Sequence, residues 1–253
     1  MIRESVKSHY PMTALTIDLS GGKGDCVDEK TGLVANHYYT IVGMQNMTIG
    51  GKVRHLVKLR NPWGWREWKG NFSDQDKIWT TEVQKGTGHN ANMKDGVFFM
   101  EYCDFNRYFK AFQVNYFRDD YIDSSFKLEL VSAKQYWFKF QIDKPGTYYF
   151  SLHQVNSKMY PPSAKYTYSD VCMTMIRIDA LGFGHNVNYA RKNDKQSFFS
   201  YDCPKGLYYF KIHPFWTSLA NQLTFSAYGP QSIQITHINP LELEPLWFYG
   251  VFA

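Results

Sequence analysis

A histidine and an asparagine stand at the two ends of a segment with the pattern of a β-hairpin. His37 precedes the first strand pattern, and Asn61 follows the second, 24 residues later in the chain. Apolar and polar side chains alternate over 42–47 and 53–59 around two glycines at 50–51, which predicts antiparallel strands joined by a tight turn. A hairpin of this length brings its outer ends together, so His37 and Asn61 are expected to be neighbours.

An asparagine beside a histidine has a definite chemical use. The amide oxygen of Asn61 can accept the Nδ1 proton of His37, which would fix the tautomer and leave Nε2 free to handle a proton. Such a pair supplies the base and the orienting group of a Cys-His-Asn arrangement. The structural alternative is that Asn61 only caps a turn and that Trp63 is a core residue.

The residues around this pair resemble a known family. The block Leu-Arg-Asn-Pro-Trp-Gly at 59–64, preceded by the His37 strand at a suitable spacing, is similar to the second half of the calpain cysteine-protease core. Residues 67–70 and 93–100 extend the resemblance, which covers roughly residues 10–117. It implies a catalytic-type His37–Asn61 pair, with Trp63 lying over their hydrogen bond and shielding it from water, where the bond is stronger.

The nucleophile is the missing part. In this family it stands on the first half of the core, in a Gln-Gly-x-Cys-Trp-like setting, and none of the 36 residues before His37 has that form. Cys26 lies in a glycine-rich loop, and Cys103, Cys172 and Cys203 follow the histidine. The chain alone is therefore not expected to cleave peptides.

Two interpretations stay open. In the first, the chain is the His/Asn half of a calpain-like cysteine endopeptidase, and a separate segment or chain carries the Cys half. In the second, it is a catalytically inactive scaffold or interaction protein in a larger assembly, such as a cytoskeletal one. The expected partner is a protein substrate in the first case and a protein partner in the second.

The resemblance also implies a calcium site after the Asn-Pro-Trp-Gly block. By position, Glu67, Asp74, Asp95 and the carbonyl of Met93 match the family's ligands, whereas Val97 stands where the family has a last glutamate. Calcium takes about six to eight oxygen ligands and gains affinity from their charge. The loss of one carboxylate therefore predicts a weakened site, with a solvated loop that binds nothing as the alternative.

The whole chain has the pattern of a mainly β protein of the α+β class, in two domains. Residues 1–117 should form a papain-like half-core of antiparallel strands with one short helix over 105–110, for which Asp104 is the expected N-cap. Residues 118–127 are polar and predict a linker. Residues 128–253 carry short strand patterns separated by turns, which predicts an antiparallel β-sandwich. By position it resembles the C2-like domain that follows the protease core of calpains.

Two features of the second domain carry alternatives. Residues 144–153 and 204–213 echo each other, and His153 and His213 occupy matching positions in the echo. No short ligand motif accompanies these histidines, which favours a structural role over a metal site. The apolar segment 240–253 predicts a packed terminal strand, with an exposed patch that docks a partner as the alternative.

Composition argues against several classes of function. The formal charge of +5 comes from scattered basic residues, which does not favour a nucleic-acid partner. Four cysteines without metal-like spacing fit free thiols in a reducing compartment. No apolar run approaches a membrane span and no signal peptide opens the chain, so a cytoplasmic location is expected. Membrane contact through a C2-like domain rests on fold analogy alone.

Overall fold

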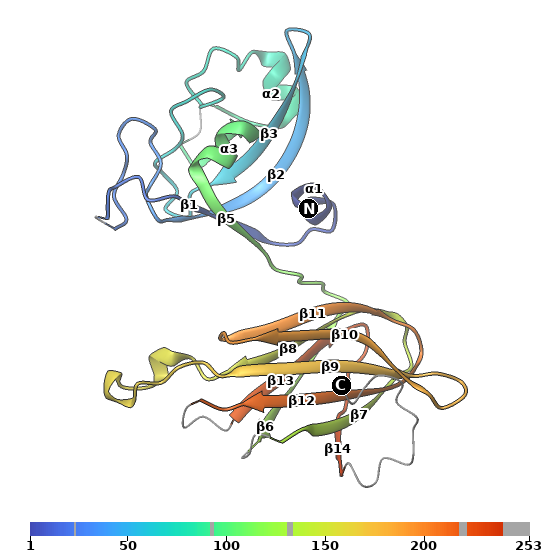
Figure 1. Ribbon diagram of the computed structural model, residues 1–253. Helices are drawn as coiled ribbons and strands as arrows, with labels where there is room; N and C mark the ends of the chain where they lie inside the picture. Colours follow the sequence, from blue (N-terminus) through green and yellow to red (C-terminus); the bar gives the residue numbers. More distant parts are fainter. Residues whose placement is uncertain (23, 92–93, 131–133, 218–221, 240–253) are drawn as a thin grey trace. The chain divides into compact units, whose positions relative to one another are not determined.

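The computed structural model divides the chain into two compact units, Met1–Arg118 and Asp119–Ala253 (Figure 1). Each unit has its own hydrophobic core, and the prediction of a mainly β chain with antiparallel sheets is confirmed. None of the helices in the described part of the chain is long and apolar enough to cross a membrane. The structure describes residues 1–22, 24–91, 94–130, 134–217 and 222–239.

Unit 1 is built on an antiparallel sheet of strand order β4-β3-β2-β1-β5. Strands β2 and β3 form the expected hairpin, and Gly50 and Gly51 at its tip have φ angles of 57° and 76°, which favour glycine. The strands are β1 (Met12–Thr16), β2 (Tyr38–Ile49), β3 (Lys52–Arg60), β4 (Val97–Glu101) and β5 (Phe109–Val114). The helices are α1 (Ile2–Lys7), α2 (Thr81–Thr87) and α3 (Tyr102–Tyr108).

Alternation along the strands buries both faces of the β3–β4 pair. Val57 and Leu59 belong to one apolar cluster, whereas Leu56, directly before Val57, belongs to another. On β4, Phe98 joins the first cluster and Phe99 the second, because successive side chains of a strand point to opposite faces. The hairpin is therefore held from both sides, which fixes the position of its outer ends.

The helix that the sequence predicts over 105–110 begins and ends earlier in the structure, as α3. Helix α3 starts at Tyr102 after Glu101, which makes no side-chain cap, so the expected start at 105 and the N-cap role of Asp104 are wrong. The chain is already in strand β5 at Phe109, because β5 pairs with β1 from Thr16↔Phe109 onward. Phe109 and Lys110, which the sequence predicts as the end of the helix, therefore belong to strand β5.

Unit 2 is a sandwich of two antiparallel sheets, of strand order β10-β9-β12-β7-β14 and β11-β8-β13-β6 in the described residues. Aromatic rings from both sheets meet between them: Phe210 lies 4.6 Å from Phe140 and 4.9 Å from Phe225, centroid to centroid. The strands are β6 (Ile122–Glu129), β7 (Tyr136–Ile142), β8 (Gly146–Gln154), β9 (Asp170–Ile178), β10 (Gly184–Lys192), β11 (Gln196–Cys203), β12 (Gly206–Phe215), β13 (Gln222–Gly229) and β14 (Thr236–Ile238); η1 (Ser157–Met159) and η2 (Pro162–Ala164) are short 3₁₀ turns.

One boundary and one strand in unit 2 differ from the sequence expectation. Strand β6 begins at Ile122, inside the stretch 118–127 that the sequence predicts as a linker, because its polar residues pair with β13 along the whole strand. Strand β10 was not predicted, since its residues are mostly polar and show no apolar alternation. The predictions for 240–253 lie outside the described residues.

The two echoing segments become equivalent strands in opposite sheets, β8 and β12. Tyr148 donates its hydroxyl hydrogen to the carbonyl of Lys144 at 2.8 Å, and Tyr208 does the same to Pro204 at 2.7 Å. Burial raises the pKa of the Tyr148 phenol to about 12. Each tyrosine thus fastens the turn that precedes its strand.

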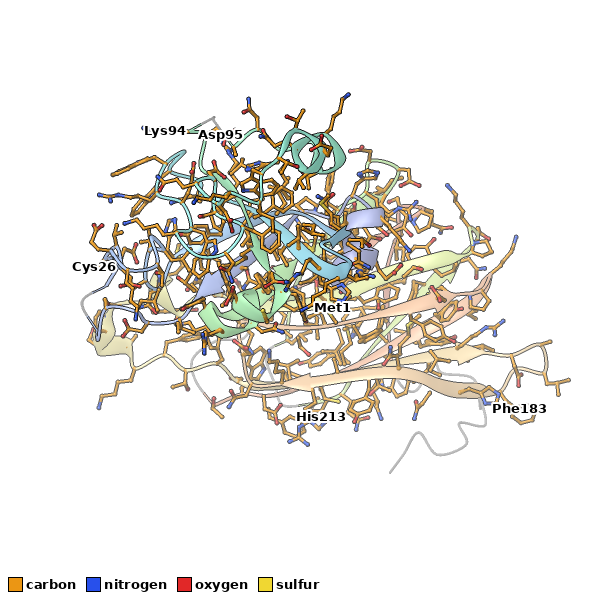
Figure 2. The ribbon with its side chains drawn as sticks, turned by 90° about the horizontal axis from the view of Figure 1, so that it is seen from above. Met1, Cys26, Lys94, Asp95, Phe183 and His213 are labelled. Carbon is orange, nitrogen blue, oxygen red and sulfur yellow. The ribbon has the colours of Figure 1, made fainter. Side chains whose placement is uncertain are left out.

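The histidines of the echo lie apart. His153 is on the outer face of β8, where Ser151 Oγ lies 2.8 Å from its Nε2. His213, labelled in Figure 2, is on the outer face of β12. Its ring lies 4.1 Å from the ring of Phe215, centroid to centroid. Within the described chain the pair belongs to no cluster of potential metal ligands.

The two tyrosine hydroxyls make a testable contribution to the sandwich. Tyr208→Phe should lower the free energy of unfolding of unit 2 by about 1 kcal/mol, because the hydrogen bond from the buried tyrosine to the Pro204 carbonyl is lost. Urea denaturation measures the change. The control is Tyr189→Phe, since that ring is 70% exposed. Equal stability of the Tyr208→Phe and Tyr189→Phe variants would contradict the assigned role.

Candidate active site

His37 lies directly before β2, at the point where the chain enters the sheet. The β1–β2 ladder ends with the pair Leu15↔Tyr38, so His37 stands just outside regular pairing. Its backbone is held instead by Thr16: the amide of His37 donates to Thr16 Oγ1 at 2.9 Å, and the amide of Thr16 donates to the His37 carbonyl at 3.1 Å. Thr16 is fully buried, and the sequence argument did not identify it.

Asn61 lies directly after β3, and its side chain is fully buried. The amide nitrogen Nδ2 donates to the carbonyls of Trp65 at 2.7 Å and Arg66 at 3.0 Å. Because carbonyl oxygens only accept hydrogen bonds, the amide can have one orientation in this pocket. Its oxygen Oδ1 therefore faces the opposite side, where it accepts from the backbone amide of Trp63 at 3.1 Å.

The structure brings His37 and Asn61 together through Nε2, which lies 3.2 Å from Asn61 Oδ1. The sequence argument assigned this contact to Nδ1, and that assignment is wrong. Only the ring nitrogen farther from the histidine backbone reaches the loop after β3. Since Oδ1 is an acceptor, Nε2 carries the proton of the neutral ring, and Nδ1 is the nitrogen with a free lone pair.

Two aromatic rings flank the imidazole. The Trp63 ring lies 4.6 Å from the His37 ring, centroid to centroid, and Tyr39 meets it edge-on at 5.2 Å. Tyr39 is fully buried and its hydroxyl accepts from the amide of Val34 at 2.9 Å. Trp63 stays 42% exposed, so it covers the imidazole while keeping one side in contact with solvent.

Gly96 holds the backbone of Asn61 in place. Its carbonyl accepts a hydrogen bond from the backbone N–H of Asn61 at 2.8 Å, and its φ angle is 80°. A Cβ atom at this position would lie 2.8 Å from the Asn61 carbonyl oxygen and 3.0 Å from the Cα of Gly64. Only glycine fits both the angle and the space.

Gly96 also connects the pair to the predicted calcium ligands. Its amide donates to Glu67 Oε1 at 2.9 Å. Burial raises the pKa of the Glu67 carboxyl, and the neighbouring charges of Asp74 and Asp95 raise it further. The carboxylates of Asp74 and Asp95 therefore lie close enough to disfavour the charge of Glu67, which is one peptide group away from Asn61.

The other carboxylate oxygens of this acidic group differ in whether they have a hydrogen-bond partner. Asp95 Oδ1 accepts from the amide of Val97 at 2.9 Å, and Asp74 Oδ1 lies 2.8 Å from Nε2 of the buried His89. Asp74 Oδ2 is buried and accepts no hydrogen bond from the described residues. Met93, the fourth predicted ligand, lies outside the described residues (Figure 2 shows Asp95 and Lys94 just beyond it).

A hard cation suits this chemistry, because an unpartnered carboxylate oxygen and crowded negative charges are both relieved by a divalent ion. The ligands are not preassembled, however. Glu67, Asp74 and Asp95 do not meet as a group within 4.8 Å, the spacing that Glu101, Cys103 and Asp104 reach in the described chain. The last three were not predicted from the sequence, and Glu101 is already paired with Arg54 at 2.9 Å.

Substitutions can test the roles of the nitrogen and the oxygen of the Asn61 side chain separately. Asn61→Ala should lower the free energy of unfolding of unit 1 by about 1–3 kcal/mol, because the hydrogen bonds of a fully buried side chain to the Trp65 and Arg66 carbonyls are lost. Asn61→Asp keeps an acceptor for His37 but sets a carboxylate against the Trp65 and Arg66 carbonyls. We expect it to be at least as destabilising at neutral pH in urea denaturation. Wild-type stability of Asn61→Asp would contradict the assigned amide orientation.

Comparison with known proteins identifies the family of unit 1. Residues 1–116 match the model of the calpain family cysteine protease. Mouse calpain-9 is 35% identical over 97 residues, rat calpain-8 is 27% identical over 150 residues, and the mouse calpain-2 catalytic subunit is 30% identical over 83 residues. These alignments cover 37%, 54% and 32% of this chain. The resemblance inferred from the sequence is confirmed over residues 1–116.

The chain is much shorter than these relatives, of which it spans 14%, 21% and 12% in the same order. Among solved structures, the cysteine protease and lectin-like domains of Cwp84 from Clostridium difficile align with 89% of this chain and 49% of that one, at 10% identity. The TM-score of 0.25 is too low to bear on either unit.

Proposed function

We propose that residues 1–116, which belong to the calpain family of cysteine proteases, are the His/Asn half of an endopeptidase core. In this proposal another segment or chain supplies the nucleophilic cysteine. The supporting observation is the 3.2 Å contact between His37 Nε2 and an Asn61 oxygen whose direction is dictated by two carbonyls on the other side of the amide. The same oxygen also accepts from the Trp63 backbone amide, which caps the turn, so the turn-capping role and the contact with His37 are compatible.

The proposed chemistry follows from the nitrogen that remains. A thiol placed beside His37 Nδ1 would transfer its proton there, giving a thiolate and an imidazolium. The sulfur then bonds to the substrate carbonyl carbon, the carbon–nitrogen bond breaks, and Nδ1–H protonates the leaving amine. Water, deprotonated by the same nitrogen, releases the acyl group and restores the thiol. The hydrogen bond from Nε2 to Asn61 holds the ring at one angle through every step.

Trp63 and Tyr39 have supporting roles in this scheme. Their rings contact the imidazole from two directions and restrict its rotation. Trp63 also limits the access of water to the Nε2–Oδ1 hydrogen bond, and such a bond is stronger in a low-dielectric environment. Because Trp63 is partly exposed, its outer edge is available to a bound peptide.

Calcium is a proposed cofactor of this unit. Glu67, Asp74 and Asp95 would hold it, together with the carbonyl of Met93. The ion would neutralise their mutual repulsion and draw the three carboxylates together. The unpartnered Asp74 Oδ2 supports this role, whereas Val97 at the position of the family's last glutamate predicts modest affinity.

A calcium titration of the 253-residue chain tests this cofactor. Glu67→Gln should weaken binding about tenfold or more, because calcium affinity depends on ligand charge. Protonation of Glu67 should compete with the ion, so affinity falls as the pH is lowered through the raised pKa of that carboxyl. The control is Glu82→Gln on α2, which lies outside the cluster. Equal affinity of the two variants would refute the proposed ligand set.

A catalytically inactive scaffold is the second candidate function. The observation that favours it is Val97, whose apolar side chain replaces a calcium-binding carboxylate at the start of β4. In that case the sandwich of unit 2, which we propose to be C2-like, would hold a protein partner in a larger assembly. The four cysteines are free thiols, and the proposed location for either function is the cytoplasm.

Cleavage by the complete assembly separates the two candidates. The chain is purified with an affinity tag from its own cells, and casein hydrolysis is measured together with labelling by an electrophilic cysteine probe. His37→Ala should abolish hydrolysis, because the thiolate is no longer formed. His55→Ala is the matched control, since His55 lies on the same hairpin and bonds to Asn46 instead.

Two results would count against the endopeptidase. Hydrolysis that survives His37→Ala would show that the activity belongs to a co-purifying enzyme. Complete absence of hydrolysis and of probe labelling in the wild-type assembly would favour the scaffold.

A further inference from the structure

Three side chains with polar groups are entirely removed from water in the described part of unit 1: Thr16, Tyr39 and Asn61. All three contact His37. Asn61 bonds to the ring, Tyr39 packs against the ring, and Thr16 bonds to the backbone. Burying a polar group is costly unless its hydrogen bonds are made. The three most deeply buried polar side chains of unit 1 in the described residues thus all hold His37.

We propose that Thr16 is a positioning residue for His37: its hydroxyl fixes the backbone of the histidine so that Nε2 meets Asn61 and Nδ1 is presented to the nucleophile. The inference rests on the proposed function of the His37–Asn61 pair and assigns the residue that aims it. Thr16 touches no reacting atom, so it is not itself catalytic.

The hydroxyl of Thr16 occupies the centre of a small network. Oγ1 accepts from the amide of His37 at 2.9 Å and donates to the carbonyl of Val34 at 2.7 Å. The amide of Thr16 donates to the carbonyl of His37 at 3.1 Å. Both polar backbone groups of the histidine are thereby bonded to one threonine, which leaves the Cα–Cβ bond of His37 with a fixed direction.

Regular sheet pairing cannot perform this task at His37. The β1–β2 ladder stops at Leu15↔Tyr38, and the β1–β5 ladder is irregular between Leu15 and Thr16. Asn36, just before the histidine, has a φ angle of 49°, a left-handed conformation that a side chain disfavours. The chain thus enters β2 through a turn, and the Thr16 hydroxyl replaces the ladder bonds that the turn removes.

A fixed backbone matters because the ring contact has little tolerance. The Nε2–Oδ1 distance is already 3.2 Å, near the long end of a protein hydrogen bond. A small rotation of the His37 backbone would break it, since the atom that bonds to Asn61 is the far end of the ring. Asn61 cannot follow, because its amide is held by Trp65 and Arg66.

Nitrogen NMR of the 253-residue chain tests this role without any nucleophile. The readouts are the ring nitrogen shifts of His37, which report the Nε2–H tautomer, and the hydrogen-exchange rate of its backbone amide. Thr16→Val preserves the shape of the side chain and removes the hydroxyl. We expect the amide of His37 to exchange at least about tenfold faster, the scale of one lost buried hydrogen bond, and the tautomer preference to be lost.

Two variants separate positioning from general stability. Thr16→Ser keeps the hydroxyl and should restore both readouts to wild-type values. Thr31→Val is the matched control: Thr31 is also buried, but its hydroxyl bonds to Asp28 and to the amide of Leu33 rather than to His37. It should leave the His37 ring signals unchanged even where it lowers the melting temperature.

An unchanged His37 tautomer and amide exchange in Thr16→Val would overturn the inference, as would equal shifts in Thr31→Val. If Thr16→Val fails to fold, Thr16→Cys takes its place, because a thiol is a much weaker donor and acceptor at the same position; wild-type signals in that variant would equally overturn it. The proposed function can fail separately: cleavage that survives His37→Ala refutes the protease and leaves this spectroscopic result standing.

Discussion

The site depends on one buried amide. Asn61 has two N–H donors and one oxygen, and the carbonyls of Trp65 and Arg66 take both donors. Its oxygen Oδ1 therefore points to His37. If the amide were reversed, Oδ1 would face the Trp65 and Arg66 carbonyl oxygens, and the buried side chain would lose its hydrogen bonds. The sharp turn through Gly64, the glycine at 96 and the two-sided packing of the β2–β3 hairpin all serve to keep that amide in place.

Gly96 joins this constraint to the acidic group. The Gly96 carbonyl accepts a hydrogen bond from the backbone N–H of Asn61, and the Gly96 N–H donates to the carboxylate of Glu67. Any change that moves Glu67, such as neutralisation of the repulsion among the three carboxylates, acts on the peptide that supports Asn61. If the proposed calcium ion is bound by this acidic group, it would act on the His37–Asn61 pair through one backbone unit rather than through a chain of side chains.

Sequence reasoning located the main elements of unit 1 and stopped at the details of contact. The hairpin around Gly50 was predictable because its alternation and its turn agree with each other. The nitrogen that bonds to Asn61 was not, because it depends on how far the turn before β2 sets the imidazole from the loop after β3. Thr16 left no motif, since a single buried threonine at the end of a strand looks like an ordinary strand residue.

The same limit applies elsewhere in the chain. In unit 2 the apolar alternation gave the inner strands, whereas β10 and the first half of β6 are polar and are held by pairing alone. Helix α3 ended early because β5 needed Phe109 for the sheet. Local pattern is informative where burial and secondary structure coincide, and it fails where backbone pairing decides.

The central claim is that His37 Nδ1 faces a cysteine thiolate supplied from outside this chain. A short bis-electrophile that can bridge a thiolate and an imidazole tests it most directly, applied to the protein purified from its own source and followed by mass-spectrometric peptide mapping. The account predicts a bridged peptide joining His37 to a cysteine that is none of Cys26, Cys103, Cys172 or Cys203. A His37 that stays unmodified while other thiols react, or a bridge to one of these four cysteines, would contradict it.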